Sequence, residues 1–213
     1  MGRFKAVFPK VAGTEIFCDP NCCDWDSLTW GRWASGGSYS ARHLFVDDWR
    51  LEHLWRKQSE GMLKAVLQGI VTAPDFTIEL DFPEPFVAFQ LWRSRVLSLF
   101  WQESGAIVVP VLQWGNPEYF PLCAMGITPG SVVAVRGPQK GTEAQWLSGM
   151  DFMLSSIRPA LILHFGRRIQ YPACSSVLFR PLRTTIPLLT TNRQKCSSMS
   201  DLSEGSKHLS AQP

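Results

Sequence analysis

Three near-continuous apolar runs stand in the middle of the chain, and segments with helical features separate them. The runs are Ile107–Leu112, Ser131–Val135 and Ala160–His164. Uninterrupted apolar runs of this length are typical of parallel strands whose two faces are both covered by helices. The pattern therefore predicts an α/β fold built on a mainly parallel sheet.

Shorter runs extend this sheet towards both ends of the chain. His43–Val46 and Gly69–Ala73 predict two earlier strands, and Val177–Phe179 is a candidate last strand. Parallel neighbours need crossover connections, which the helical segments between the runs provide. The expected architecture is three-layered, with about five or six strands arranged as an open doubly wound sheet or as a partial barrel.

Helical periodicity marks three connecting segments. Trp49–Leu67 has apolar residues at helical spacing, and Gly61 is expected to divide it into two shorter helices. Phe86–Ser104 predicts the most aromatic helix. Thr142–Gln145 fits a capping box, which predicts the start of a further helix.

The aromatic helix carries a stripe that is expected to face the core. On this interpretation Gln90, Arg93 and Gln102 lie largely elsewhere on the helix. The stripe consists of Phe89, Trp92, Val96, Leu99 and Phe100. Its tryptophan is also a candidate for stacking on nucleic-acid bases, but an aromatic stripe at helical spacing is more often part of a core.

Composition favours one globular unit with less regular ends. The 213 residues are 45% hydrophobic and 18% charged, which is enough to bury a substantial core. We expect an irregular lead-in rich in Cys, Trp and Gly over residues 1–42, an α/β domain over 43–180, and a Ser-rich basic tail over 181–213. No apolar run approaches the roughly 18 residues that cross a bilayer, and a secretory pattern is missing. A cytoplasmic protein with no membrane partner is the expectation.

The charge is unevenly distributed. Residues 167–213 hold seven Lys or Arg against two Asp or Glu, whereas residues 1–166 hold 14 against 16. A basic tail can bind polyanions. It can equally be a solvated segment, because its charges are scattered among Ser, Thr and Pro.

The lead-in contains a close group of thiols, at Cys18, Cys22 and Cys23. Such a group could hold zinc, although structural zinc sites usually take four ligands in two separated pairs. The alternative is a set of reduced cysteines in an irregular segment, which suits a chain with six Cys and no disulfide framework.

Polar residues recur where the predicted strands end. Asp47, Asp75, Gln113, Arg136 and His164 each follow or close a different apolar run. Parallel pairing would bring these ends to one edge of the sheet, where α/β proteins bind ligands. The two aspartates suit acid/base work or a divalent cation, the arginine suits an anion, and the histidine suits proton transfer. The alternative is structural: a helix cap, an Asx turn and a core histidine.

Two neighbours add to this candidate site. Trp114 follows Gln113 directly, and Lys140 lies in the glycine-bounded turn Gly137–Gly141 before a predicted helix. That turn is typical of a phosphate-binding helix start, but it lacks the spacing of a P-loop. The nucleophile elbow, the zinc helix and the dinucleotide fingerprint are also missing, so the common enzyme classes are not supported.

Several motifs in order resemble a known family. They are Asp47–Arg50, Pro74–Phe76, Gln90–Arg93, Ile107–Val111 with Gln113–Gly115, and Gly130–Val135. Together they resemble the bacterial and phage family domain of unknown function 4417 over about residues 43–166. The resemblance implies an association with phages or other mobile elements, and it implies no particular activity.

Two functions remain open. One is a small-ligand or phosphoester site at the strand ends, with the residues named above. The other is a non-catalytic accessory protein that binds nucleic acid or a host protein through the basic tail and through Arg42, Arg50, Arg93 and Arg95.

Overall fold

The protein is a parallel α/β structure, as the apolar runs predict. The computed structural model describes residues 15–169 and 176–180, so the whole predicted tail, 181–213, lies outside the described residues. Within these ranges the strands form two four-stranded sheets, and every strand pair is parallel. The prediction of a mainly parallel sheet with crossover helices is confirmed.

In both sheets, the strands are ordered as they occur along the chain. The first sheet contains β1 (Trp30–Arg32), β2 (Ala41–His43), β3 (Ile70–Thr72) and β4 (Ile107–Val109). The second contains β5 (Val111–Leu112), β6 (Val132–Arg136), β7 (Leu161–Phe165) and β8 (Ser176–Arg180). Parallel strands in sequential order are generally joined by right-handed crossovers, which place the connecting helices on one side of a sheet, as in a partial barrel. Strand β1 comes from the lead-in, where the sequence shows no regular pattern.

Pro110 joins the two sheets. The run Ile107–Leu112, expected as one strand, is divided at this residue, so that β4 pairs with β3 and β5 pairs with β6. Proline has no backbone N–H to donate to a ladder. Its carbonyl still accepts a hydrogen bond from the Ala134 N–H at 2.9 Å. One residue therefore carries the chain from the first sheet into the second.

A shared core lies between the sheets. The ring of Phe165, from β7, lies 5.2 Å from the Trp30 ring, 5.2 Å from the His43 ring and 5.1 Å from the Phe45 ring, measured between centroids. Inward positions of the second sheet, such as Ala134, join the same cluster. The two sheets are thus held together by side chains from both.

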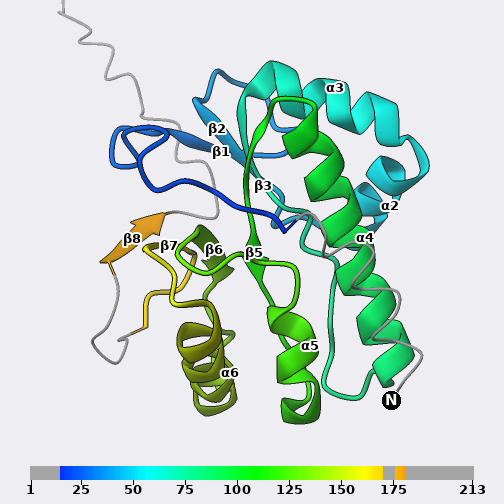
Figure 1. Ribbon diagram of the computed structural model, residues 1–213, viewed down its shortest axis with the longest axis vertical. Helices are drawn as coiled ribbons and strands as arrows, with labels where there is room; N and C mark the ends of the chain where they lie inside the picture. The colour runs from blue at the N-terminus through cyan, green and yellow to red at the C-terminus, as the bar shows by residue number, and fades with distance from the viewer. Residues whose placement is uncertain (1–14, 170–175, 181–213) are drawn as a thin grey trace, which may run out of the picture.

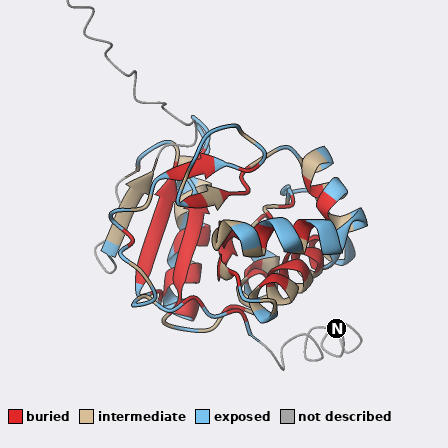
Figure 2. Ribbon diagram, turned by 90° about the horizontal axis from the view of Figure 1, so that it is seen from above, coloured by how far each residue is buried: buried red, intermediate tan, exposed pale blue. Residues whose placement is uncertain are grey.

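The helices cover the outer faces. They are α2 (Asp48–Arg56), α3 (Gln58–Gln68), α4 (Glu84–Glu103), α5 (Phe120–Ala124) and α6 (Glu143–Ile157), with a 3-10 turn η2 (Pro117–Tyr119). Figure 1 shows α2, α3 and α4 beside the first sheet, and α5 and α6 side by side below the second. Figure 2 shows buried helix faces turned towards the strands and exposed faces turned outwards. No helix within the described residues is long and apolar enough to cross a membrane.

The division of the first helical segment differs from the prediction. Helices α2 and α3 meet at Lys57, whose backbone leaves the helical region (φ −120°, ψ 59°). Gly61 lies inside α3 and is buried. A Cβ there would stand 3.1 Å from Leu54 Cδ2, so glycine at this position permits close packing of the two helices.

The buried face of α4 was predicted wrongly. Phe89 is 41% exposed, whereas Arg93 and Arg95 are only 4% and 1% exposed. Both arginines are paired: Arg93 with a carboxylate, and Arg95 with the carbonyl oxygens of Cys123 and Met125. The other four residues of the predicted stripe are all half-buried: Trp92, Val96, Leu99 and Phe100. The inner face of this helix thus combines apolar side chains, such as Leu91, Leu97 and Trp101, with polar side chains that have internal partners.

The start of α6 also differs in detail from a capping box. The Thr142 hydroxyl donates to the Gln139 carbonyl at 3.1 Å instead of capping the helix. The Glu143 carboxylate accepts from the Gly141 N–H at 2.8 Å. The helix still begins where the sequence indicates, but Glu143, and not Gln145, bonds to the turn before it.

Candidate functional site: a cleft at the carboxyl ends of the strands

A cleft lies where β3, β5 and β6 end. The compartment next to the strand ends, called the inner compartment for this reason alone, has a volume of about 190 Å³ and is lined by Asp75, Thr77, Ile78, Leu112, Gln113, Trp114, Arg136 and Trp146. An adjoining outer compartment of about 340 Å³ shares Ile78, Trp114, Arg136 and Trp146, and adds residues from Gly137 to Gln145 and from the 79–80 loop. Residues from both sheets thus form one continuous cleft.

Asp75 supplies the carboxyl group of the inner compartment. It follows β3 directly after Ala73 and Pro74 and is only partly exposed. Burial raises the pKa of Asp75 to about 7, with Arg136 opposing the rise and Asp48 adding to it. This side chain can therefore exchange a proton near neutral pH, which an ordinary surface aspartate cannot do.

Gln113 supplies an amide with no internal partner. It follows β5, is 9% exposed, and lines the inner compartment. Neither its amide nitrogen nor its amide oxygen hydrogen-bonds to any described residue. A buried polar atom without a partner typically costs about 1–3 kcal/mol. Gln113 therefore lines the cleft while its amide atoms stay buried and unpaired behind the surface of the cleft.

Arg136 and two tryptophans form the opposite wall. Arg136 is the last residue of β6 and is exposed, and its carbonyl accepts from Trp146 Nε1 at 2.9 Å. The Trp114 and Trp146 ring centroids are 5.5 Å apart, with planes inclined at 53°. A Cβ on Gly149 would lie 2.1 Å from Trp114 Nε1, so the indole packs directly on the α6 backbone. The wall is fixed in place by packing.

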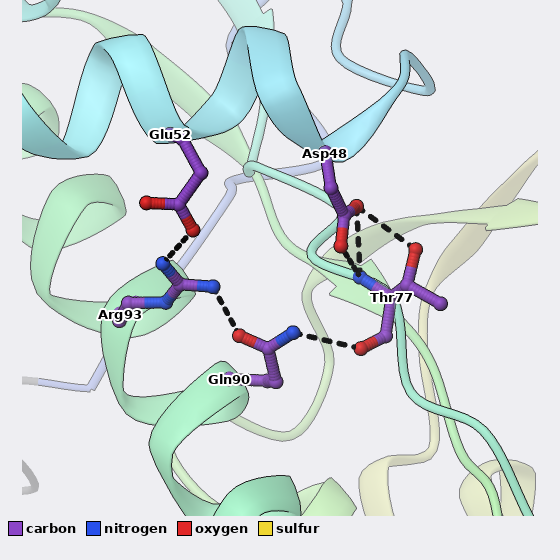
Figure 3. A network of polar contacts seen from close by, with 5 residues as sticks. All are labelled: Asp48, Glu52, Thr77, Gln90 and Arg93. Atoms are coloured by element: carbon purple, nitrogen blue, oxygen red, sulfur yellow. Dashed lines mark hydrogen bonds and ion pairs between the residues drawn. The ribbon is translucent and has the colours of Figure 1, made fainter.

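A polar network braces the loop that carries the cleft carboxyl group (Figure 3). Thr77 donates from its backbone N–H and its hydroxyl to the Asp48 carboxylate, at 3.2 and 2.8 Å. The Gln90 amide donates to the Thr77 carbonyl at 3.0 Å. Arg93 donates to the oxygens of Gln90 and Glu52. Helices α2 and α4 are thereby tied to the same loop.

The residues on either side of Asp75 are held as well. Ser94 donates its hydroxyl to the Pro74 carbonyl at 2.7 Å. The Arg93 guanidinium lies 3.9 Å from the centroid of the Phe76 ring. Since both neighbours are fixed by α4, Asp75 has little freedom to leave the cleft.

Four of the candidate residues from the sequence meet in the cleft: Asp75, Gln113, Trp114 and Arg136. Asp47 does not line it. The Asp47 side chain is 74% exposed and its nearest basic partner is Arg50, at 4.0 Å. The carboxylate that influences Asp75 is that of Asp48, the residue that follows Asp47 in the sequence.

His164 and Lys140 also lie outside the lining residues. His164 is fully buried, its Nε2 lies 2.7 Å from the Arg167 carbonyl oxygen, and burial lowers the pKa of its imidazole. It packs below Gly137, where a Cβ would come within 2.6 Å of the ring nitrogen. Lys140 is exposed in the turn before α6.

The three lead-in thiols differ in their exposure. Cys18 is buried, Cys23 is half-buried and Cys22 is exposed. Burial and the neighbouring Cys22 raise the pKa of Cys23 to about 12, and the pKa of Cys18 is also raised, mainly by burial. Across the described ranges, no three His, Cys, Asp or Glu side chains are grouped to hold a metal ion.

Sequence reasoning missed two residues that matter here. Trp146, in the first turn of α6, lines both compartments. Asp48, at the start of α2, anchors Thr77. A tryptophan at the first turn of a helix that follows a strand end is the signal that could have placed Trp146 near the cleft.

The fold and the cleft define a parallel α/β protein with a polar site at the carboxyl edge of its strands. The chain belongs to the family Domain of unknown function (DUF4417), whose sequence model matches residues 14–180. This confirms the resemblance seen in the sequence. The match also includes the lead-in from residue 14, together with β1.

Two relatives come from mycobacteriophages. The chain is 28% identical over 178 residues to the Gene 1 protein of Mycobacterium phage D29, covering 78% of this chain and 65% of that protein. It is 31% identical over 132 residues to the Gene 1 protein of Mycobacterium phage L5, covering 60% of this chain and 57% of that protein. The chain thus spans less than two thirds of either relative. No solved structure matches it.

Proposed function

We propose that the cleft binds a small phosphate-bearing molecule and that Asp75 exchanges a proton with it. The observation that carries this proposal is the convergence of Asp75, Gln113 and Arg136 on one cavity from the ends of three different strands. Ligands of α/β proteins bind at such carboxyl ends.

The charges around the cleft suit an anion. Arg136 is an exposed guanidinium, which matches the geometry of phosphate oxygens. Thr142 and Gln145, at the amino-terminal end of α6, line the outer compartment. The positive end of a helix dipole favours negative charge there. With a pKa of about 7, Asp75 is largely neutral below that pH and does not repel a phosphate.

The biological setting follows from the relatives. Because two of them are mycobacteriophage proteins, we assign this chain a role in a phage or another mobile element. We place that role in the cytoplasm, whose reducing conditions suit the free cysteines at positions 18, 22, 23 and 123.

The alternative is nucleic-acid or host-protein binding through the basic tail and four arginines. The tail lies outside the described residues, and the four arginines give the alternative less support than the cleft has. Arg93 and Arg95 are buried and paired inside the molecule. Arg42 donates to the Ser35 and Gly37 carbonyls, both at 2.8 Å. Arg50 lies over the indole of the adjacent Trp49, at 4.3 Å. Since these cations already have partners, the cleft is the better-supported site.

Calorimetric titration tests the proposal. Inorganic phosphate and ribose 5-phosphate should bind the wild-type protein, and Arg136→Gln should weaken both by at least about tenfold, which corresponds to about 1.4 kcal/mol. Arg56→Gln is the matched control, because Arg56 is exposed at the end of α2, away from the cleft lining. Melting curves on all three proteins establish that the variants are folded.

The protonation of Asp75 gives a second readout. The affinity for phosphate should fall as pH rises through about 7, because an ionised Asp75 repels the ligand. Asp75→Asn should remove that part of the pH dependence. If the wild-type protein binds neither probe, or if Arg136→Gln and Arg56→Gln behave alike, the proposal fails.

A further inference from the structure

We propose that the cleft cleaves a phosphate ester, with the Thr77 hydroxyl as the nucleophile, the Asp48 carboxylate as its base and the Asp75 carboxyl group as the acid for the leaving oxygen. This inference rests on the proposed function, because it takes the same phosphate site and assigns a reaction to it. The ligand class is thereby narrowed to phosphate monoesters, whose phosphoryl group passes first to the protein and then to water.

The Thr77 hydroxyl is hydrogen-bonded to a carboxylate, which is the arrangement of a nucleophile and its base. Thr77 Oγ1 donates to Asp48 Oδ1 at 2.8 Å, and Figure 3 shows the two side chains directed at each other. A hydroxyl is a weak nucleophile until a base within about 2.6–3.2 Å takes its proton. Asp48 also accepts the Thr77 backbone N–H at 3.2 Å, which holds the carboxylate in this position. Thr77 is exposed and lines the inner compartment, so a ligand there can reach it.

Asp75 lies on the same side of the chain as Thr77. Pro74 and Phe76 are buried, whereas Asp75 and Thr77 are more exposed and both line the inner compartment. Such alternation is typical of an extended chain, in which residues two apart share a face at a spacing of about 7 Å. A phosphoryl group between them would have the nucleophile on one side and the acid on the other, as an in-line displacement requires.

The charges around Asp75 suit an acid that works beside a phosphate. Arg136 is exposed and lines both compartments, so its guanidinium can neutralise the oxygens of the phosphoryl group. Burial raises the pKa of Asp75 to about 7, and the charges of Arg136 and Asp48 act on it in opposite directions. An acid whose pKa is close to neutral pH can both donate and accept a proton during one reaction cycle. Asp75 is therefore suited to both steps of the reaction.

The reaction has two steps. In the first, Asp48 takes the proton of the Thr77 hydroxyl, Oγ1 attacks the phosphorus, and the bond between phosphorus and the ester oxygen breaks. The ester oxygen leaves with the electron pair and takes the proton of Asp75. In the second, ionised Asp75 takes a proton from water, the water oxygen attacks the phosphothreonine, and Oγ1 leaves and regains its proton from Asp48. The products are an alcohol and inorganic phosphate, and the three side chains return to their first state.

The first test uses the wild-type protein alone. It is incubated with p-nitrophenyl phosphate and with ribose 5-phosphate, and the release of inorganic phosphate is measured. Mass spectrometry of the acid-quenched protein should find a phosphoryl group on Thr77. Turnover should fall as pH rises through about 7, because Asp75 then loses the proton that it donates.

Asp75→Asn separates the two steps. Turnover of ribose 5-phosphate should fall at least about hundredfold, because its alkoxide leaves poorly without a proton, whereas p-nitrophenolate needs none. The variant also lacks the base of the second step, so phosphothreonine formed from p-nitrophenyl phosphate should accumulate. A residue that only binds the ligand would produce neither effect.

Thr77→Val and Asp48→Asn test the nucleophile and its base. Each should lower turnover at least about hundredfold, and Thr77→Val should carry no phosphoryl group. Thr77→Ser keeps a hydroxyl and should still be phosphorylated. Thr128→Val is the matched control, because the Thr128 hydroxyl also donates to a carboxylate, that of Glu15 at 3.3 Å, but lies outside the cleft lining. This control should turn over like the wild-type protein, and melting curves establish which variants are folded.

The outcomes separate this inference from the proposed function. If ribose 5-phosphate binds and neither ester is cleaved, the reaction is overturned and the phosphate site stands. If the esters are cleaved and Thr77→Val keeps its turnover, the assignment of the nucleophile is overturned. If no phosphate-bearing probe is bound or cleaved, the proposed function and this inference fall together.

Discussion

Replacing Asp75 by asparagine should make the protein more stable above neutral pH. The folded-state pKa of Asp75 is about 7, whereas its ordinary value is 3.8. Between these values the folded protein keeps a proton that the unfolded chain has released. Stability is therefore fully present below about pH 4 and is lost as pH rises towards and through 7. Asparagine cannot ionise, so the variant should not show this loss.

The size of the effect follows from the pKa and from the environment. A shift from 3.8 to about 7 corresponds to about 4 kcal/mol for a carboxyl group fully shielded from water. Asp75 lines a cavity and remains partly exposed, so solvent screens the ionised form. We therefore expect the variant to gain about 1–3 kcal/mol over the wild-type protein at alkaline pH, and close to nothing in acid.

Urea unfolding across about pH 5 to pH 9 measures this difference directly. Asp47→Asn provides the matched control, because Asp47 is a carboxylate one residue from Asp48 that lies outside the cleft. The control should follow the wild-type stability at every pH. The reasoning is refuted if Asp75→Asn has the same pH dependence as the wild-type protein, or if it is the less stable of the two at alkaline pH.

Two further substitutions test the supports of the cleft. Arg93→Met should lower the free energy of unfolding by about 1–3 kcal/mol, because it removes the hydrogen bonds from a buried guanidinium to Glu52 and Gln90. A change below about 0.5 kcal/mol in urea unfolding would contradict a structural role for this pair. Gly149→Ala should cost about 1–3 kcal/mol, although alanine usually favours a helix, because the new Cβ collides with Trp114. Gly36→Ala, where a Cβ meets nothing within 4 Å, is its control, and near-ultraviolet circular dichroism should change for Gly149→Ala alone.

The sequence could predict the edge of the site because strand direction is a local property. Asp75, Gln113 and Arg136 each lie at the end of an apolar run, and parallel pairing brings such ends together. Asp47 does not reach the cleft, and the apolar run before it, His43–Val46, does not show why. Strand β2 ends at His43, so several residues intervene before Asp47, and the chain has turned into α2 by then.

The inner face of α4 could not be predicted from helical spacing. Gln90 is bonded to a residue 13 positions away, and Arg93 to one 41 positions away. Helical periodicity assigns polar residues to the solvent-facing side, because it takes account only of the residues within one helix. These two side chains are buried because the fold brings Thr77 and Glu52 to them. Long-range partners of this kind have no signal within one segment.

The joint at Pro110 has a mechanical consequence for the cleft. Asp75 follows a strand of the first sheet, Arg136 ends a strand of the second, and Gln113 lies just beyond the joint. The angle between the sheets thus sets how far the acid stands from the cation. That angle is held by the ring cluster around Phe165, which does not line the cleft. Substitutions in that cluster would change the angle between the sheets. They would therefore alter the width of the cleft without replacing any residue that lines it.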